Sequence, residues 1–172
     1  PAHRAAPIAM AGTLDDEAVV LAAIADATLS HANPVAADSS AATVSLCRQL
    51  VSGVAWQDAL HAVASARSAA VADALLAGLS SPPTDRGEFA PAALRAAVHF
   101  VATSEDFHAA VSRAVTFAGP ANYCPVIVGA VAGARWGAAS IPSADLSHCT
   151  SLGRVEVAAD KLADTWQSGQ AR

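Results

Sequence analysis

Residues 116–142 read TFAGPANYCPVIVGAVAGARWGAASIP, and this segment holds the most informative pattern in the chain. Within it, Gly129, Gly133 and Gly137 stand four residues apart. Residues four apart lie on one face of a helix, so the spacing predicts a helix with a stripe that carries no side chains. Glycine inside a helix costs about 0.5–1 kcal/mol relative to alanine, so the stripe needs a compensating contact. Two contacts remain open: another backbone packed closely against the stripe, or a ligand that lies against it.

The composition predicts an all-α fold. Of the 172 residues, 53% are hydrophobic but only 5% are aromatic, which indicates a core built mainly of alanine and valine. Alanine is the best helix former, so this composition favours helices over strands. The length is typical of one domain, and we expect residues 1–172 to form a single domain with a substantial core.

Charge, hydropathy and cysteine usage argue against several classes of protein. The net charge of −5, without a basic cluster, argues against a nucleic-acid partner. Arg135 and Trp136 end the apolar run far short of the roughly 20 residues that a membrane span needs. Cys47, Cys124 and Cys149 form no C-x-x-C pair and are typical of reduced, buried thiols. Because no hydrophobic signal core follows the N-terminus, we expect a cytoplasmic protein.

Breaks at proline, glycine and polar residues divide the rest of the chain. We expect an extended segment over residues 1–14 and a surface loop over residues 80–91, which hold three prolines and one glycine. The apolar periodicity predicts further helices over residues 18–29, 35–52, 56–79, 92–102, 107–116 and 155–167, with a short helical turn over residues 143–149.

Acidic and polar residues mark two of these helix starts. The triplet DDE at residues 15–17 places negative charge at the positive end of a helix dipole. We interpret it as capping, with a metal-binding role as the alternative. At the start of the helix near residue 107, Thr103 and Asp106 have the spacing of a capping box, with Thr103 as the N-cap.

Residues 129–142, GAVAGARWGAASIP, resemble the C-terminal signature of the ADP-ribosylglycohydrolase family. In that family a helix of this kind ends in Ile-Pro and follows an acidic loop, Gly-Gly-Asp-Thr-Asp-Thr. Weaker matches precede it in the family's order: RAAPI at residues 4–8, SHANP at residues 30–34, and the paired segments within residues 94–111. The resemblance implies an orthogonal multi-helix bundle like the C-terminal part of the family fold, with the N-terminal part absent and a cleft for ADP-ribose.

The metal-binding loop of the family is not matched. Active members hold two divalent cations, usually magnesium, on aspartates of an early motif and of the late acidic loop, because hard cations prefer oxygen ligands. Here Pro120 and Asn122 stand where the two late aspartates would be, and the early motif has no counterpart. Proline offers no ligand and an asparagine oxygen is neutral. We therefore expect no metal site, no catalytic residue and no cofactor in this chain alone.

The resemblance still suggests a ligand-binding set, which consists of His31, Gly119, Asn122, Tyr123, Gly129 and Gly133. His31 matches the family histidine near the cleft; the alternative is a turn histidine hydrogen-bonded to the backbone. Tyr123 would stack on adenine or ribose; the alternative is a core aromatic. Gly119 and the free amides around Asn122 would receive a phosphate at a helix start.

Three functions remain open from the sequence. The first is a degenerate or truncated domain that keeps an ADP-ribose or nucleotide pocket without di-metal hydrolysis. The second is an active hydrolase whose missing half is supplied by another chain. The third is a non-catalytic interaction subunit, in which a second copy or a partner protein covers the apolar face that the missing half would bury.

Overall fold

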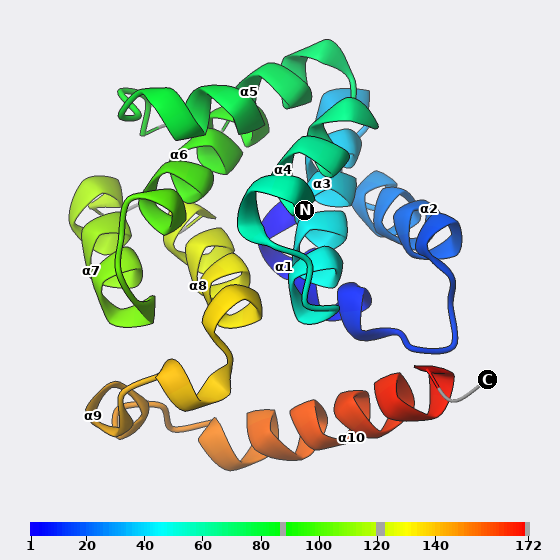
Figure 1. Cartoon of the computed structure of the whole chain (residues 1–172), viewed down its shortest axis with the longest axis vertical. Coiled ribbons are helices and arrows are strands. Elements are labelled where there is room, and N and C mark those ends of the chain that lie inside the picture. Colours follow the sequence, from blue (N-terminus) through cyan, green and yellow to red (C-terminus); the bar gives the residue numbers. More distant parts are fainter. Residues whose placement is uncertain (87–88, 120–122, 171–172) are drawn as a thin grey trace.

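The computed structural model describes residues 1–86, 89–119 and 123–170. These residues form helices and connecting loops, with no strand among them, so the all-α prediction is confirmed. In chain order the helices, shown in Figure 1, are α1 (Ala2–Ala5), the 3-10 helix η1 (Ala6–Met10), α2 (Asp16–Thr28), α3 (Pro34–Val51), α4 (Trp56–Ser65), α5 (Ala69–Ser80), α6 (Ala90–Ala102), α7 (Phe107–Ala118), α8 (Tyr123–Trp136), the 3-10 helix η2 (Ala138–Ser140), α9 (Ser143–Leu146) and α10 (Leu152–Gln170).

Helix α3 is the centre of the bundle. It packs against α1, α2, α4, α5, α6 and α8. Small side chains allow this close approach, and two of the buried polar ones bond within the helix. Ser39 donates its hydroxyl to the Val35 carbonyl at 2.8 Å, and Thr43 donates to the Ser39 carbonyl at 2.9 Å. These bonds satisfy buried hydroxyls without a partner from another helix.

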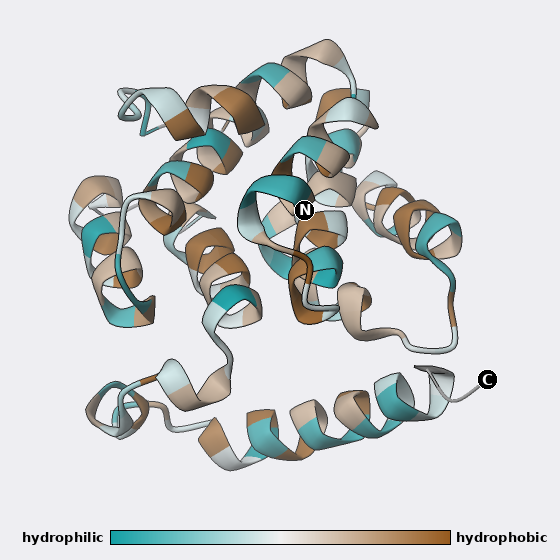
Figure 2. Ribbon diagram, viewed as in Figure 1, coloured by the Kyte–Doolittle hydropathy of each residue, from teal (hydrophilic) through white to brown (hydrophobic). Residues whose placement is uncertain are grey.

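The core combines small residues with a few large aliphatic ones. Its largest fully buried side chains include Leu46, Leu60, Leu75, Leu94 and Ile127, one from each of α3, α4, α5, α6 and α8. Helix α10 differs from these helices, since it lies along one end of the bundle and contacts mainly η1 (Figure 1). Figure 2 shows hydrophobic and hydrophilic segments alternating along α10. No helix in the described part of the chain is long and apolar enough to cross a membrane.

The helix predicted over residues 56–79 is wrong, because the structure has two helices there. α4 ends at Ser65 and α5 begins at Ala69. The carboxylate of Asp38, on α3, accepts a hydrogen bond from the Ser68 amide at 2.8 Å and another from the Ser68 hydroxyl. This bond from a distant helix satisfies the backbone at the break.

The extended segment predicted over residues 1–14 is also wrong. Residues 2–10 form α1 and η1. The guanidinium of Arg48 donates to the carbonyl of Ala9 within η1 at 3.1 Å, and to the carbonyls of Ala11 at 3.3 Å and Leu14 at 2.7 Å after it. The short helices are thus held by a residue far away in the sequence. Local propensity alone does not stabilise helices of this length.

One of the two predicted helix caps is confirmed. Asp15 is the N-cap of α2, and its Oδ1 accepts from the Ala18 amide at 2.8 Å. The capping box with Thr103 as N-cap is wrong. Asp106 itself caps α7 by accepting from the Ala109 amide at 2.8 Å, whereas Thr103 follows the end of α6. Aspartate is a strong N-cap residue, so it takes this position directly.

The glycine spacing correctly predicted a helix, but the close backbone packing proposed for it is wrong. A Cβ atom at Gly129 would meet nothing within 4 Å, and one at Gly133 would meet only the Phe107 ring at 4.0 Å. Gly137 lies beyond the end of α8, with φ of +81°. Close backbone contact occurs elsewhere, because a Cβ atom at Gly169 of α10 would collide with the Gly12 backbone. The ligand alternative for the stripe stays a prediction.

Two substitutions in this segment should have opposite effects on stability. Gly129→Ala removes backbone entropy from the unfolded chain at an open helical position, so we expect the free energy of unfolding to rise by about 0.5–1 kcal/mol. Gly137→Ala places a side chain at a positive φ and should lower the free energy of unfolding by about 1–2 kcal/mol. Urea denaturation followed by circular dichroism measures both. Destabilisation by Gly129→Ala would contradict the open environment.

Candidate functional site

A pocket of about 320 Å³ lies where the starts of α1, α3, α6 and α8 meet. Its walls include His3 of α1, His31 and Asn33 of the turn before α3, Phe89 before α6, and Tyr123 and Ile127 of α8. Two residues predicted to bind ligand, His31 and Tyr123, therefore line one cavity. The sequence did not single out His3, Asn33 or Phe89, because only the fold brings them to this place.

The turn that carries His31 is fixed by its neighbours. Asn33 is the N-cap of α3, and its Oδ1 accepts from the Val35 amide at 2.9 Å. Pro34 occupies the first turn of α3, where the missing N–H has no cost. His31 is exposed, and its Nδ1 lies 3.0 Å from the Ser30 hydroxyl. The turn thus places the imidazole of His31 at the pocket. Its hydrogen bond is with the side chain of Ser30.

Tyr123 and His3 form the aromatic part of the pocket. Their rings lie 5.3 Å apart, with their planes tilted by 54°. Burial lowers the pKa of His3, and nearby positive charges, including Arg4 and His31, lower it further. His3 is therefore neutral near pH 7, with one ring nitrogen as a donor and the other as an acceptor. The half-buried Tyr123 is part of a pocket wall that a ligand can reach.

The other predicted ligand residues are not part of this pocket or cannot be placed. Gly119 follows α7 with φ of +59° and is exposed. Gly129 and Gly133 lie on α8 but are not among the residues that line the cavity. Asn122, and with it Pro120, lies outside the described residues. The described fold therefore brings together two of the six predicted residues.

A family model, ADP-ribosylglycohydrolase, matches residues 1–172. The chain belongs to the ADP-ribosylglycohydrolase family. Among solved structures, a chain of an ADP-ribosylglycohydrolase-related protein complex matches with a TM-score of 0.83 and 23% identity. The match covers 92% of this chain and 57% of that one, so this chain spans little more than half of its length. At this identity the likeness shows the fold. No curated protein matches the chain.

The pocket does not offer the ligands that magnesium in ADP-ribosylglycohydrolases would need. Among the described residues that line it, the polar side chains are the imidazoles of His3 and His31, the amide of Asn33 and the phenol of Tyr123, without a carboxylate. Magnesium prefers charged oxygen ligands, so this donor set does not fit it. Among the described residues, no group of three or more histidine, cysteine, aspartate or glutamate side chains is placed to hold a metal ion.

Cys47 and Cys124 are poorly suited to act as nucleophiles. Burial raises the pKa of Cys47 and of Cys124 to about 12, which keeps both thiols protonated near neutral pH. A protonated thiol is a poor nucleophile. The prediction of burial is confirmed for these two residues and is wrong for Cys149, which is exposed.

The structure also brings together a serine, a histidine and an aspartate that the sequence did not connect. His108 Nδ1 lies 2.8 Å from Asp145 Oδ2, and the Ser112 hydroxyl lies 3.4 Å from His108 Nε2. Nucleophilic catalysis also needs donors for the oxyanion, whereas the backbone amides around Ser112 are used within α7. Both His108 and Asp145 are largely exposed. We interpret the contact as a surface pair that connects α9 to α7.

The pair between His108 and Asp145 should depend on pH in a defined direction. The hydrogen bond to Asp145 raises the pKa of His108 above its ordinary value, and the carboxylate charge adds to this effect. The stabilisation is therefore complete below the unfolded-state pKa of about 6.5 and is lost as pH rises through the folded-state pKa. NMR titration should show a lower His108 pKa in Asp145→Asn than in the unsubstituted chain. An unchanged pKa would contradict the ion pair.

Proposed function

We propose that this domain binds ADP-ribose or a related nucleotide in the pocket lined by His31 and Tyr123, and that it does so without di-metal hydrolysis. The observation that carries the proposal is the meeting of these two residues in one cavity. They come from distant parts of the sequence, and the family resemblance suggested both as ligand residues before the fold was considered. Membership of the ADP-ribosylglycohydrolase family supports this class of ligand.

The size and chemistry of the pocket favour one ring of the ligand. A volume of about 320 Å³ is near the lower end of the range of about 300–1,000 Å³ for ligand pockets, so it suits a base or a ribose better than a whole dinucleotide. Tyr123 provides a flat aromatic face for stacking. His3, which is neutral, and the exposed His31 provide donors and acceptors for hydroxyl groups or a base edge.

The proposal excludes magnesium from this pocket because the donor set holds no carboxylate. Without that cation, the residues bind and orient a nucleotide but do not activate water for attack on the glycosidic bond. A cytoplasmic location, which we propose from the free cysteines, suits a nucleotide ligand.

Calorimetric titration with ADP-ribose tests this function. We expect the same affinity with and without magnesium, and a loss of about 5- to 150-fold in Tyr123→Ala, because aromatic stacking on a base contributes about 1–3 kcal/mol. His31→Ala should also weaken binding. His61→Ala is the matched control, since His61 is an exposed histidine on α4 away from this pocket.

Two results would contradict the proposal in different ways. Binding that requires magnesium would show that the metal-free interpretation is wrong. Absence of binding under both conditions would exclude the nucleotide pocket and favour the second function described next.

A second candidate function is an interaction subunit, as a homo-oligomer or as the partner of another protein chain. The observation that favours it is the open face of α8, where no atom lies within 4 Å of a Cβ at Gly129 and Val126 is 45% exposed. The matching solved chain extends well beyond the part that this chain covers. We propose that a second copy or a partner protein covers this face.

Light scattering after size-exclusion chromatography tests the second function. We expect a mass that rises with concentration toward that of a dimer, and a lower mass for Val126→Glu because the charge would be buried in the interface. Thr116→Glu, an exposed position on α7, serves as the control. A single monomeric mass over the whole concentration range would contradict self-association and leave a different chain as the partner to be sought by co-purification.

A further inference from the structure

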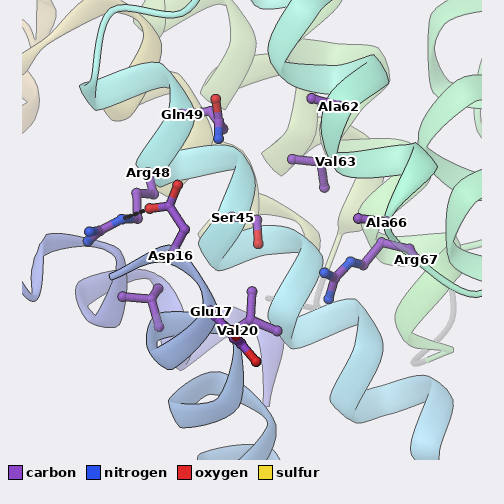
Figure 3. A pocket seen from close by; sticks show the side chains of 11 residues that line it. Asp16, Glu17, Val20, Ser45, Arg48, Gln49, Ala62, Val63, Ala66 and Arg67 are labelled. Carbon is purple, nitrogen blue, oxygen red and sulfur yellow. Dashed lines mark hydrogen bonds and ion pairs between the residues drawn. The ribbon is translucent and has the colours of Figure 1, made fainter. Parts of the chain in front are cut away.

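A second cavity, of about 260 Å³, lies between α2, α3 and α4 (Figure 3). It shares no lining residue with the pocket of His31 and Tyr123. Its apolar wall includes Val20 and Val63, and its polar groups include Ser45, Glu17 and Arg67. Apart from Glu17, which belongs to the acidic triplet at residues 15–17, none of these residues was suggested as a ligand residue by the sequence, so the cavity requires its own interpretation.

Arg67 is the unusual residue of this cavity. Its side chain is only 10% exposed, and its Nη1 has a long ion pair of 3.4 Å with Asp38. The carboxylate of Asp38 already accepts two bonds from Ser68, at the break between α4 and α5. The Nε of Arg67 is buried without a partner among the described residues. Figure 3 shows the guanidinium reaching from the end of α4 toward α3 and Ser45.

A second arginine in the same cavity provides a comparison. Arg48 is buried to a similar extent, but its guanidinium has an ion pair of 2.6 Å with Asp16 and donates to three backbone carbonyls. A buried charge is costly unless it is paired and hydrogen-bonded. The protein compensates the buried charge of Arg48 with a short ion pair and three hydrogen bonds. It compensates the buried charge of Arg67 with only a long ion pair. The buried Nε of Arg67, which has no partner among the described residues, and the long ion pair with Asp38 leave this guanidinium able to bind an anion.

The charge balance of the cavity selects the kind of anion. Asp16 pairs with Arg48, and Asp38 pairs with Arg67 at the longer distance of 3.4 Å, so Glu17 is a further acidic group near Arg67. A dianion such as phosphate would be repelled by Glu17, whereas a monoanion would be held by the guanidinium. Arginine binds carboxylates with two parallel hydrogen bonds. The valine walls suit a short apolar body beside the charged group.

We propose that the cavity between α2, α3 and α4 binds a small carboxylate with a short apolar body, with the carboxylate on Arg67 and the body against Val20 and Val63. Two kinds of molecule share this chemistry. A simple carboxylic acid would use Arg67 alone. An apolar α-amino acid would in addition place its ammonium group near Glu17, at the beginning of α2.

Calorimetry with butyrate, L-valine and inorganic phosphate on the full chain tests the site. We expect butyrate or valine to bind and phosphate to bind at least tenfold more weakly. Arg67→Gln should lose at least tenfold in affinity for the carboxylate but keep its affinity for ADP-ribose, since the two pockets share no residue. Arg154→Gln, on the exposed face of α10, is the matched control and should bind as the unsubstituted chain does.

Two further variants keep the test decisive. Val20→Phe fills the cavity without removing a charge and should abolish carboxylate binding even if Arg67→Gln does not fold. Glu17→Gln should weaken valine but not butyrate if the ligand is an amino acid. Equal binding by Arg67→Gln and the unsubstituted chain, equal affinity for phosphate and carboxylate, or no binding of either carboxylate would overturn the proposal.

Discussion

The structure depends on the buried guanidinium of Arg48, in the central helix α3. It donates to the carbonyls of Ala9, Ala11 and Leu14, pairs with Asp16, and lies 4.9 Å from the centre of the Trp166 ring. One side chain thus connects the segment after η1, the start of α2 and the end of α10 to the core. Buried carbonyls that lack a donor cost about 1–3 kcal/mol each, so replacing this arginine would affect all three segments together.

The same constraint connects the core to the pocket of His31 and Tyr123. Arg48 fixes the end of η1, and α1 precedes η1 directly while packing against α3 and α8. This position brings His3 to within 5.3 Å of the Tyr123 ring. The pocket therefore depends on a residue that does not line it. Arg48 affects the pocket indirectly, through its contacts with the N-terminal segment. The residues that line the cavity come from four different chain segments.

The sequence predicted the fold well where local signals decide it. Alanine-rich periodicity placed α2, α3, α6, α7 and α8, and Asp15 marked the start of α2. The prediction was wrong where a side chain distant in the sequence determines the local structure. Arg48 does so at residues 1–14, and Asp38 does so at the break between α4 and α5. The same distinction between local signals and distant contacts applies to the residues of the two cavities. His31 and Tyr123 could be suggested from motifs, but His3 and Arg67 gain their environments only from the fold.

Many of the described aspartates hold structural contacts away from the pocket of His31 and Tyr123. A di-metal site needs several acidic side chains that converge on one cavity. Here many of the described aspartates have structural contacts elsewhere, as caps or in ion pairs: Asp15, Asp16, Asp26, Asp38, Asp106 and Asp145. A carboxylate that caps a helix or pairs with an arginine holds its position through that contact, so moving it to a cation would break a stabilising interaction. Among its described residues, the pocket of His31 and Tyr123 instead presents aromatic rings and an amide.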